Sequence, residues 1–168
     1  MRNTESLSKN MYFDEIRPKH SSALARFMQE NDVPEIVKTF NPFPMTSETA
    51  KKIACTPRRD HYYGAFLDER IIGLSMLRGW DEGYTVPSFG IMVDHRFHSK
   101  GVGKRMLDYT IQQAVRLDCQ HVRLSVFASN RTAVYLYASR GFIEESRESV
   151  LLMGESDEKI IMFKELCA

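Results

Sequence analysis

A glycine-containing loop between an extended apolar run and a long helical pattern constrains this chain more than any other feature. The run covers residues 89–93 and the helical pattern covers residues 102–118. The loop and the first helical residues are His98, Ser99, Lys100, Gly101, Val102, Gly103 and Lys104. The first N–H groups of a helix have no intrahelical partner, the helix dipole adds positive charge there, and glycines let an anion come close. Strand, glycine loop and helix in this order predict a phosphate-type anion site.

Two commoner glycine loops do not fit this stretch. A Walker A loop would need Gly in place of His98 and Ser or Thr in place of Arg105. The dinucleotide-binding fingerprint would need a small residue in place of Met106, and no strand–helix–strand unit precedes it. Taken alone, the loop is also compatible with a tight turn that binds nothing, because short glycine motifs discriminate weakly.

Size and charge are those of an ordinary globular protein. The 168 residues suffice for one domain with a substantial core, and 43% of them are hydrophobic. The 23 Lys and Arg residues nearly balance the 22 Asp and Glu residues, which gives a formal net charge of +1. This balance gives no sign of a nucleic-acid partner or of an acidic membrane surface. We expect a single domain over residues 11–168, after a flexible polar leader over residues 1–10.

Cysteine and histidine positions argue against disulfides and metals. Cys55, Cys119 and Cys167 are odd in number, far apart and in no metal-binding spacing. The five histidines have no acidic or cysteine partner in a known ligand pattern, so no metal is expected. Residues 1–10 lack the apolar centre of a signal peptide, and no segment has the roughly 18 apolar residues of a membrane span. We therefore expect a cytoplasmic protein without membrane contact.

Hydrophobic periodicity predicts the α/β class with a mixed sheet, in the element order β-α-α-β-β-β-α-β-α-β-β. The expected strands are 11–17, 61–67, 71–77, 84–93, 121–127, 142–153 and 159–166, the last two joined by a turn over 154–157. The expected helices are 21–31, 47–55, 102–118 and 130–140. Ser21 or Ser22 would cap the first, Thr46 the second, and Gly141 would end the last. Only residues 84–142 show the alternation typical of parallel strands joined by a crossover helix.

Two residues interrupt the strand expected over residues 84–93. Proline cannot donate to a ladder and glycine weakens a strand, so Pro87 and Gly90 predict a bulge or a splay from the neighbouring strand. A splayed strand exposes backbone groups with which an extended ligand can pair.

A second motif lies about thirty residues after the glycine loop. Asn130 stands at a predicted helix start, Tyr137 one turn before its end, and Gly141-Phe142 just after it. Taken alone, Asn130 reads as a helix cap and Tyr137 as packing.

Together, the two motifs resemble the GNAT superfamily of acyl-CoA-dependent N-acetyltransferases. That family's loop, Arg/Gln-x-x-Gly-x-Gly/Ala, is matched over residues 98–103, with His98 in the first place. Its later signature, Asn-x-x-Ala-x-x-x-Tyr followed by Gly-Phe, is matched by Asn130, Ala133, Tyr137, Gly141 and Phe142. The resemblance covers about residues 60–165. It implies a GNAT-like fold with a splayed central strand pair, and transfer of acetyl from the cosubstrate acetyl-CoA to an amine in a ternary complex.

The resemblance also implies residue roles. Backbone groups of Ser99 to Lys104 would hold the pyrophosphate of coenzyme A, and Asn130 would hydrogen-bond its pantetheine arm. Main-chain groups of the strand would pair with the same arm; they belong to Ile91, Met92 and Val93. Tyr137 would stand near the thioester sulfur and protonate the departing thiolate. His98 departs from the family's Arg or Gln, and a partly charged imidazole would weaken a phosphate contact or make it pH-dependent.

The base that deprotonates the amine is less clearly marked. The strand segment 85–89 has no carboxylate, so Glu82, beside Asp81, is our first choice. The alternative is that Glu82 and Asp81 are exposed loop charges with no catalytic role. Trp80 would line the acceptor pocket or simply pack, and the same two possibilities hold for Phe40 and Phe43 in the proline-flanked loop.

The acceptor is not specified by the sequence. We favour the primary amine of a small molecule or an amino-sugar, because Asp81 and Glu82 suit a cationic amine and aromatic side chains can stack on a sugar. A protein N-terminus or lysine is an alternative acceptor, and a catalytically silent acyl-CoA-binding sensor or scaffold is an alternative function. The resemblance also allows a homodimer.

Overall fold

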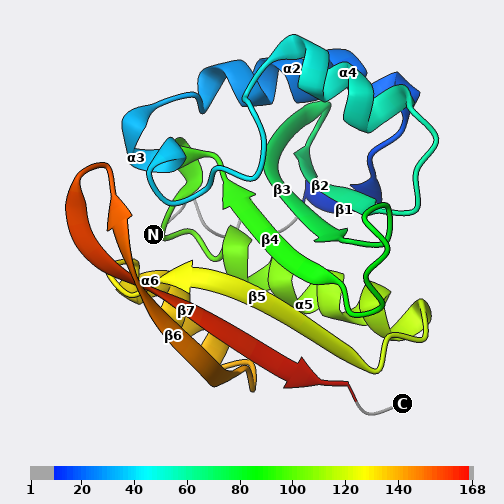
Figure 1. Ribbon diagram of the computed structural model, residues 1–168. Coiled ribbons are helices and arrows are strands. Elements are labelled where there is room, and N and C mark those ends of the chain that lie inside the picture. Colours follow the sequence, from blue (N-terminus) through cyan, green and yellow to red (C-terminus); the bar gives the residue numbers. More distant parts are fainter. Residues whose placement is uncertain (1–9, 167–168) are drawn as a thin grey trace.

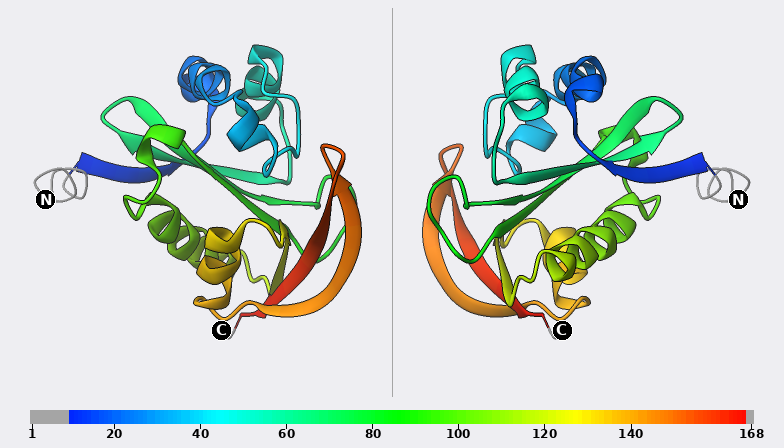
Figure 2. Two further views of the ribbon diagram at one scale, coloured as in Figure 1. Left: turned by 90° about the vertical axis from the view of Figure 1, so that its left-hand side faces the viewer. Right: turned by 90° about the vertical axis from the view of Figure 1, so that its right-hand side faces the viewer.

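The computed structural model describes residues 10–166, which form one seven-stranded mixed sheet with helices on both faces (Figures 1 and 2). The strands are β1 (Met11–Glu15), β2 (His61–Leu67), β3 (Arg70–Arg78), β4 (Ser88–Val93), β5 (His121–Phe127), β6 (Ile143–Leu152) and β7 (Glu155–Glu165). The helices are α2 (Ser21–Glu30), α3 (Pro34–Val37), α4 (Ser47–Cys55), α5 (Val102–Arg116) and α6 (Arg131–Ala138), with 3-10 turns η1 (Pro18–His20) and η2 (His95–Phe97). The predicted class and element order are confirmed, with α3 and the 3-10 turns added.

The strand order across the sheet is β1-β2-β3-β4-β5-β7-β6. Neighbours are antiparallel except β4 and β5, which are parallel and are joined by the crossover helix α5. This confirms the parallel unit expected within residues 84–142.

The parallel pair β4–β5 is held at one end only. Ser88 is opposite Arg123, and the Arg123 N–H donates to the carbonyl of Pro87 at 3.1 Å. Beyond that point, no register pair joins the two strands in the described part of the chain. The strands therefore diverge toward their carboxyl ends, as Figure 1 shows, and the predicted splay is confirmed.

Of the two predicted alternatives, a bulge or a splay, the structure has the splay, and no bulge interrupts the pairing of β4 with β3. The β3–β4 register runs without a shift from Gly73↔Val93 to Arg78↔Ser88, and it pairs Gly90 with Met76. A Cβ at position 90 would come within 3.1 Å of the Met76 side chain, so the glycine makes room for Met76.

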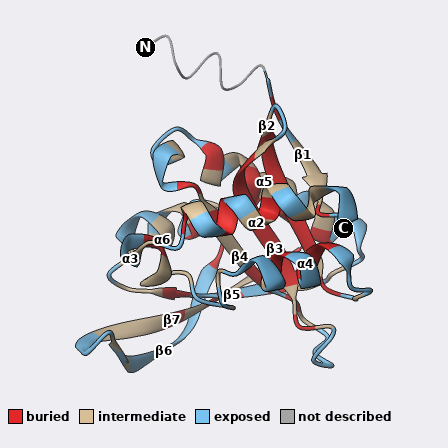
Figure 3. Ribbon diagram, turned by 90° about the horizontal axis from the view of Figure 1, so that it is seen from above, coloured by how far each residue is buried: buried red, intermediate tan, exposed pale blue. Residues whose placement is uncertain are grey.

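Two layers of helices bury the two faces of the sheet (Figure 2). On one face, Leu24, Phe27 and Met28 of α2 pack with α4 and with Phe66 and Leu74 of the sheet. On the other face, α5 and α6 cover the apolar side of β5, through residues such as Leu107, Leu124 and Tyr137. The central strands are buried along most of their length (Figure 3).

Several predicted boundaries need correction. The strand expected from Tyr84 begins at Ser88, because residues 79–84 form turns closed by the Tyr84 N–H to the Gly79 carbonyl. The expected turn over 154–157 is shorter, because β7 begins at Glu155. Neither Ser21 nor Ser22 caps α2, which continues directly from η1 with His20 as its N-cap residue. Nine residues of the predicted leader, 1–9, and Cys167 lie outside the described residues.

A buried carboxylate fixes the end of β4 to the rest of the domain. Asp94 is fully buried, and its oxygens accept from the Arg96 backbone N–H and from the Arg96 guanidinium at 2.9 and 2.6 Å. Arg70 lies 3.5 Å away, and Arg70 and Arg96 both bind Glu30 at the end of α2. Burial alone would raise the pKa of Asp94, but the hydrogen bonds from Arg96 outweigh it and lower that pKa. The loop that follows β4 is thereby anchored to α2 and β3.

Replacing Asp94 with Asn should lower the free energy of unfolding at pH 7 by about 2–3 kcal/mol. Breaking a buried ion pair costs about 3–5 kcal/mol, and the partial exposure of both arginines reduces this. Because the folded-state pKa of Asp94 is lowered, its stabilisation is complete above the unfolded-state pKa of about 4 and is lost as the pH falls below it. Urea unfolding at pH 7 and pH 3 measures both effects.

Asp108→Asn is the matched control, because Asp108 is half-exposed and pairs with Arg140 near the surface. Its cost should stay below about 1 kcal/mol. Equal stability of Asp94→Asn and the unsubstituted protein at pH 7 would contradict the anchoring role.

Candidate functional site

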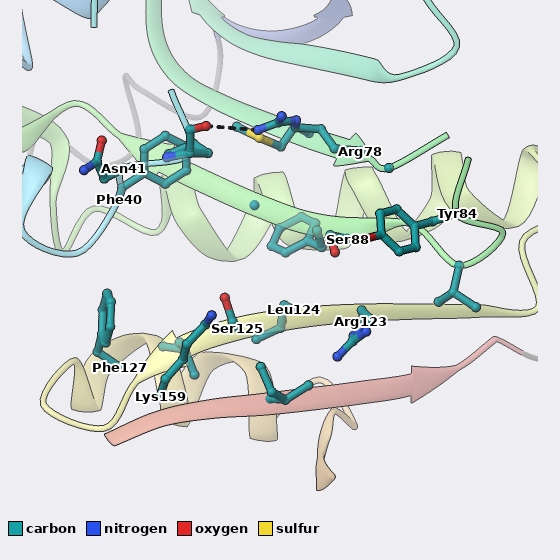
Figure 4. Close-up of a pocket in the computed structure, with 18 of the residues that line it drawn as sticks. Phe40, Asn41, Arg78, Tyr84, Ser88, Arg123, Leu124, Ser125, Phe127 and Lys159 are labelled. Carbon is teal, nitrogen blue, oxygen red and sulfur yellow. Dashed lines mark hydrogen bonds between the residues drawn. The ribbon is translucent and has the colours of Figure 1, made fainter. Parts of the chain in front are cut away.

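The divergence of β4 and β5 opens into a cavity of about 590 Å³ (Figure 4). Its walls come from the loop 39–42, the end of β3, the loop after β3, the first half of β4, and strands β5 and β7. Its polar lining includes Arg78, Glu82, Arg123, Ser125 and Lys159. The cavity therefore lies where an unpaired strand edge meets charged side chains.

The glycine loop lies beyond the opposite end of β4, at the start of α5. Ser99 and Gly101 both have positive φ, 59° and 78°, and this turns the chain sharply into the helix. No side chain caps α5, and within residues 10–166 the N–H groups of Val102, Gly103 and Lys104 have no hydrogen-bond partner. The structure thus has the free N–H groups at a helix start on which the predicted anion site depends, and anion binding there stays a prediction.

Gly103 is not required by the packing of the protein itself. A Cβ there would meet Val93 and Leu136 at 3.6 and 3.8 Å, which are ordinary contact distances. The absence of a side chain at this position keeps the backbone N–H groups open to a bound anion.

The imidazole of His98 has a main-chain partner. Its Nε2 lies 2.9 Å from the carbonyl oxygen of Val93, so Nε2–H donates to the last residue of β4. This hydrogen bond holds the loop against the strand.

Asn130 caps α6, as its position predicts. Its Oδ1 accepts from the Ala133 N–H at 3.2 Å, which leaves the amide NH₂ available as a donor. At the other end, Gly141 has φ 80°, and the Phe142 N–H reaches back to the Tyr137 carbonyl at 3.2 Å. This pair of features is a Schellman ending, which confirms Gly141 as the residue that ends the helix.

Tyr137 is buried beside β4 and is not among the residues that line the cavity. Its ring packs edge-on against the rings of Phe89 in β4 and Phe142, with distances between ring centroids of 6.0 and 5.9 Å. Burial raises the pKa of the Tyr137 phenol well above its usual range, so the hydroxyl keeps its proton and can only donate or accept hydrogen bonds.

Of the two acids after β3, only Glu82 reaches the cavity. Its carboxylate is half-exposed and lies 3.5 Å from Arg78. Asp81 instead accepts from the backbone N–H groups of Arg59 and Asp60, and so supports a turn. Trp80 packs edge-on against His61 at 5.6 Å and does not line the cavity.

The two aromatic residues of the proline-flanked loop have different positions. Phe40 lines the cavity, while Phe43 lies under the Arg78 guanidinium and against Tyr62. Both also pack against the core cluster under α2 and α4. Packing therefore holds for both rings, and a role of Phe40 in an acceptor pocket stays a prediction.

Sequence reasoning missed three cations on the cavity wall: Arg78, Arg123 and Lys159. The signal was the polar half of the alternation in β5, where Arg123 and Ser125 are exposed between buried Val122, Leu124 and Val126. Both positions line the cavity and are also exposed to solvent (Figure 4).

No group of three or more His, Cys, Asp or Glu side chains within residues 10–166 is arranged to hold a metal ion. No helix in that range is long and apolar enough to cross a membrane.

Comparison with known proteins gives one consistent result. The family model described as "Acetyltransferase (GNAT) family" matches residues 25–142. The chain is 32% identical over 92 residues to a spermine/spermidine N(1)-acetyltransferase of Bacillus subtilis. That match covers 49% of this chain and 60% of the relative's length, so the chain spans less than two thirds of that relative.

Solved structures share the fold at low identity. A GNAT-family acetyltransferase from Streptococcus pneumoniae superposes with a TM-score of 0.75 at 19% identity, over 94% of this chain and 99% of that one. A ribosomal L7/L12 alpha-N-protein acetyltransferase in complex with coenzyme A gives a TM-score of 0.77 at 12% identity, over 95% and 96% of the two chains.

Removing the α6 cap should destabilise the protein modestly. Asn130→Ala should lower the free energy of unfolding by about 1 kcal/mol, which corresponds to a fall in Tm of about 2–4 °C. Asn130→Ser should keep most of the stability of the unsubstituted protein, because serine caps a helix equally well. Thermal unfolding followed by circular dichroism tests this. If the Ala and Ser variants melted together, the capping bond would not contribute.

Proposed function

The chain belongs to the GNAT acetyltransferase family, and from that membership we propose that it is an acetyl-CoA-dependent N-acetyltransferase acting on a primary amine of a small molecule. The observation that carries the proposal is the free set of N–H groups at the start of α5, next to a strand pair that parts after one contact.

Coenzyme A fits these features. The N–H groups of residues 102–104, with Ser99 to Gly101, would hold its pyrophosphate, and Lys100 and Lys104 would add positive charge. The edge of β4 that faces β5 would pair through Ile91, Met92 and Val93 with the pantetheine arm, as an added strand would. The free amide NH₂ of Asn130 would donate to the same arm. His98 would hold the loop through the hydrogen bond of its Nε2 to the Val93 carbonyl, and only its Nδ1 would be free to contact a phosphate.

The reaction we propose is direct attack within a ternary complex. The amine nitrogen attacks the thioester carbonyl carbon, an N–C bond forms, the C–S bond breaks, and the sulfur leaves as a thiolate. The Tyr137 hydroxyl would donate a hydrogen bond to that sulfur. A phenol with a raised pKa does not give up its proton readily to a thiolate, whose conjugate acid has a pKa of about 8.5, so stabilisation by hydrogen bonding is the main contribution.

Glu82 is the base we propose for the amine. It is the one carboxylate among the residues that line the cavity, and its side chain is accessible from the open side. Asp94, at the far end of β4, is unsuitable because it is fully buried and bound to Arg96.

The similarity to a spermine/spermidine N(1)-acetyltransferase supports a small-molecule acceptor. The aromatic side chains of Phe40 and Tyr84, which line separate parts of the cavity, could each stack on an amino-sugar. A protein N-terminus or lysine, and a silent acyl-CoA sensor, remain the alternatives, of which the sensor would not need Tyr137. We place the protein in the reducing cytoplasm, since Cys55 and Cys119 are free thiols, and a homodimer is compatible with the family.

Blocking the helix start should abolish coenzyme A binding. We expect Gly103→Ala to weaken the affinity for acetyl-CoA and Gly103→Leu to remove saturable binding at millimolar ligand, because side-chain atoms would occupy the space of the phosphate. Calorimetric titration with acetyl-CoA and CoA measures this, with Tm as the check on folding. Absence of binding to the unsubstituted protein would refute the assignment.

Removing the Tyr137 hydroxyl should slow the chemical step while leaving binding intact. We expect Tyr137→Phe to lower kcat about ten- to a hundredfold, with an unchanged Kd for acetyl-CoA. Tyr135→Phe is the matched control, because Tyr135 lies on the same helix and is 78% exposed. Thiol release with a panel of amines measures kcat. Equal kcat for the two variants would remove Tyr137 from the mechanism.

A further inference from the structure

The charge on the cavity wall does not match that of a purely cationic acceptor. Among the residues that line the cavity, three are cations, Arg78, Arg123 and Lys159, and one is a carboxylate, Glu82. A polyamine would bring several ammonium groups among these cations, and like charges at close range are unfavourable.

The three cations differ in how far they are already neutralised. Arg78 lies 3.8 Å from Asp60 and 3.5 Å from Glu82, and Lys159 lies 3.6 Å from Glu148 of β6. Arg123 has no carboxylate within 4 Å in the described part of the chain, and its side chain is exposed. The uncompensated charge of the cavity is therefore at Arg123.

Arg123 is also placed rigidly. Its backbone N–H donates to the Pro87 carbonyl in the contact that closes the split, and β7 pairs with it on the other side through Phe163. Its side chain lines the cavity, as does that of Arg78 at the end of β3, on the far side of β4 (Figure 4). A guanidinium whose backbone is held in place and which has no carboxylate partner is suited to bind two oxygens of an acid group at once.

Resting on the proposed transferase function, we propose that the acceptor carries an acid group, a carboxylate or a phosphate, in addition to its reacting amine, and that Arg123 binds this acid group. Arg78 and Lys159 add positive charge around it, while Glu82 stays near the amine. The substrate class is thus an amino acid-like or phosphorylated amine, in contrast to the polyamine of the Bacillus relative.

The test compares amines that differ only in the acid group. We would measure kcat/KM by thiol release for butylamine against 4-aminobutanoate, for ethanolamine against O-phosphoethanolamine, and for glucosamine against its 6-phosphate. The first pair probes carboxylate, and the others probe phosphate. We expect the acid member of at least one pair to exceed its partner at least about tenfold.

The variants locate the effect. Arg123→Gln should lower kcat/KM for the preferred acid about tenfold and should change that of its acid-free partner less than about twofold. Arg123→Lys should recover part of the loss. Arg116→Gln is the matched control, because Arg116 is exposed at the end of α5 and does not line the cavity.

Two negative results are distinguishable. If the acid-free amines were preferred, or if Arg123→Gln lowered both members of a pair equally, the acid-group inference would be overturned and the transferase function would stand. If acetyl-CoA bound but no amine, spermidine included, released thiol, the proposed function would fall and the inference with it.

Discussion

The two halves of the sheet are joined at one place, where Ser88 is opposite Arg123 and the Arg123 N–H donates to the Pro87 carbonyl. No further register pair joins β4 and β5 within residues 10–166, and the two strands part beyond this point. Proline has no N–H to offer, so the pairing at this end stops at the carbonyl. The antiparallel partners of both strands, β3 and β7, keep them in place without further pairing between them. A sheet can therefore contain an open, unpaired edge in its middle without losing its integrity.

A second set of contacts fixes where the glycine loop lies relative to that edge. Asp94 follows β4 immediately and is bound by Arg96 and Arg70, while His98 returns to the Val93 carbonyl. The chain between β4 and α5 thus has little freedom, although it is exposed over most of residues 95–101. A rigid loop places free N–H groups at a fixed distance from the strand edge, and a ligand with a phosphate at one end and an extended arm needs that arrangement.

The sequence was informative where local rules decide the outcome. The start of α5, the Asn130 cap, the Gly141 ending and the splay at Pro87 each follow from the conformational preferences of a few adjacent residues, and the structure has all of them. The close approach of Gly90 to Met76 could not be predicted, because the two residues are neighbours across strands and no local pattern reveals such a contact.

Long-range charge pairing was equally out of reach. The ionic group around Asp94 joins residues 30, 70, 94 and 96, and nothing in the order of the chain brings these together. The net charge of +1 also gave no sign of the basic cavity, because a sum over 168 residues does not show where the positive charges lie. The roles of the loop, of Tyr137 and of Glu82 stay predictions, because they concern molecules that the fold alone does not contain.

The split also separates two kinds of environment, and this bears on the proposed chemistry. Tyr137 lies on the face covered by α5 and α6, packed between Phe89 and Phe142, whereas Glu82 lies on the open side of the cavity. A buried phenol stays neutral and donates strongly, because few water molecules compete for its proton. A half-exposed carboxylate stays hydrated and can pass a proton to solvent. In the proposed reaction the amine must lose a proton and the sulfur must gain stabilisation, and these two steps need the two different environments that Glu82 and Tyr137 have.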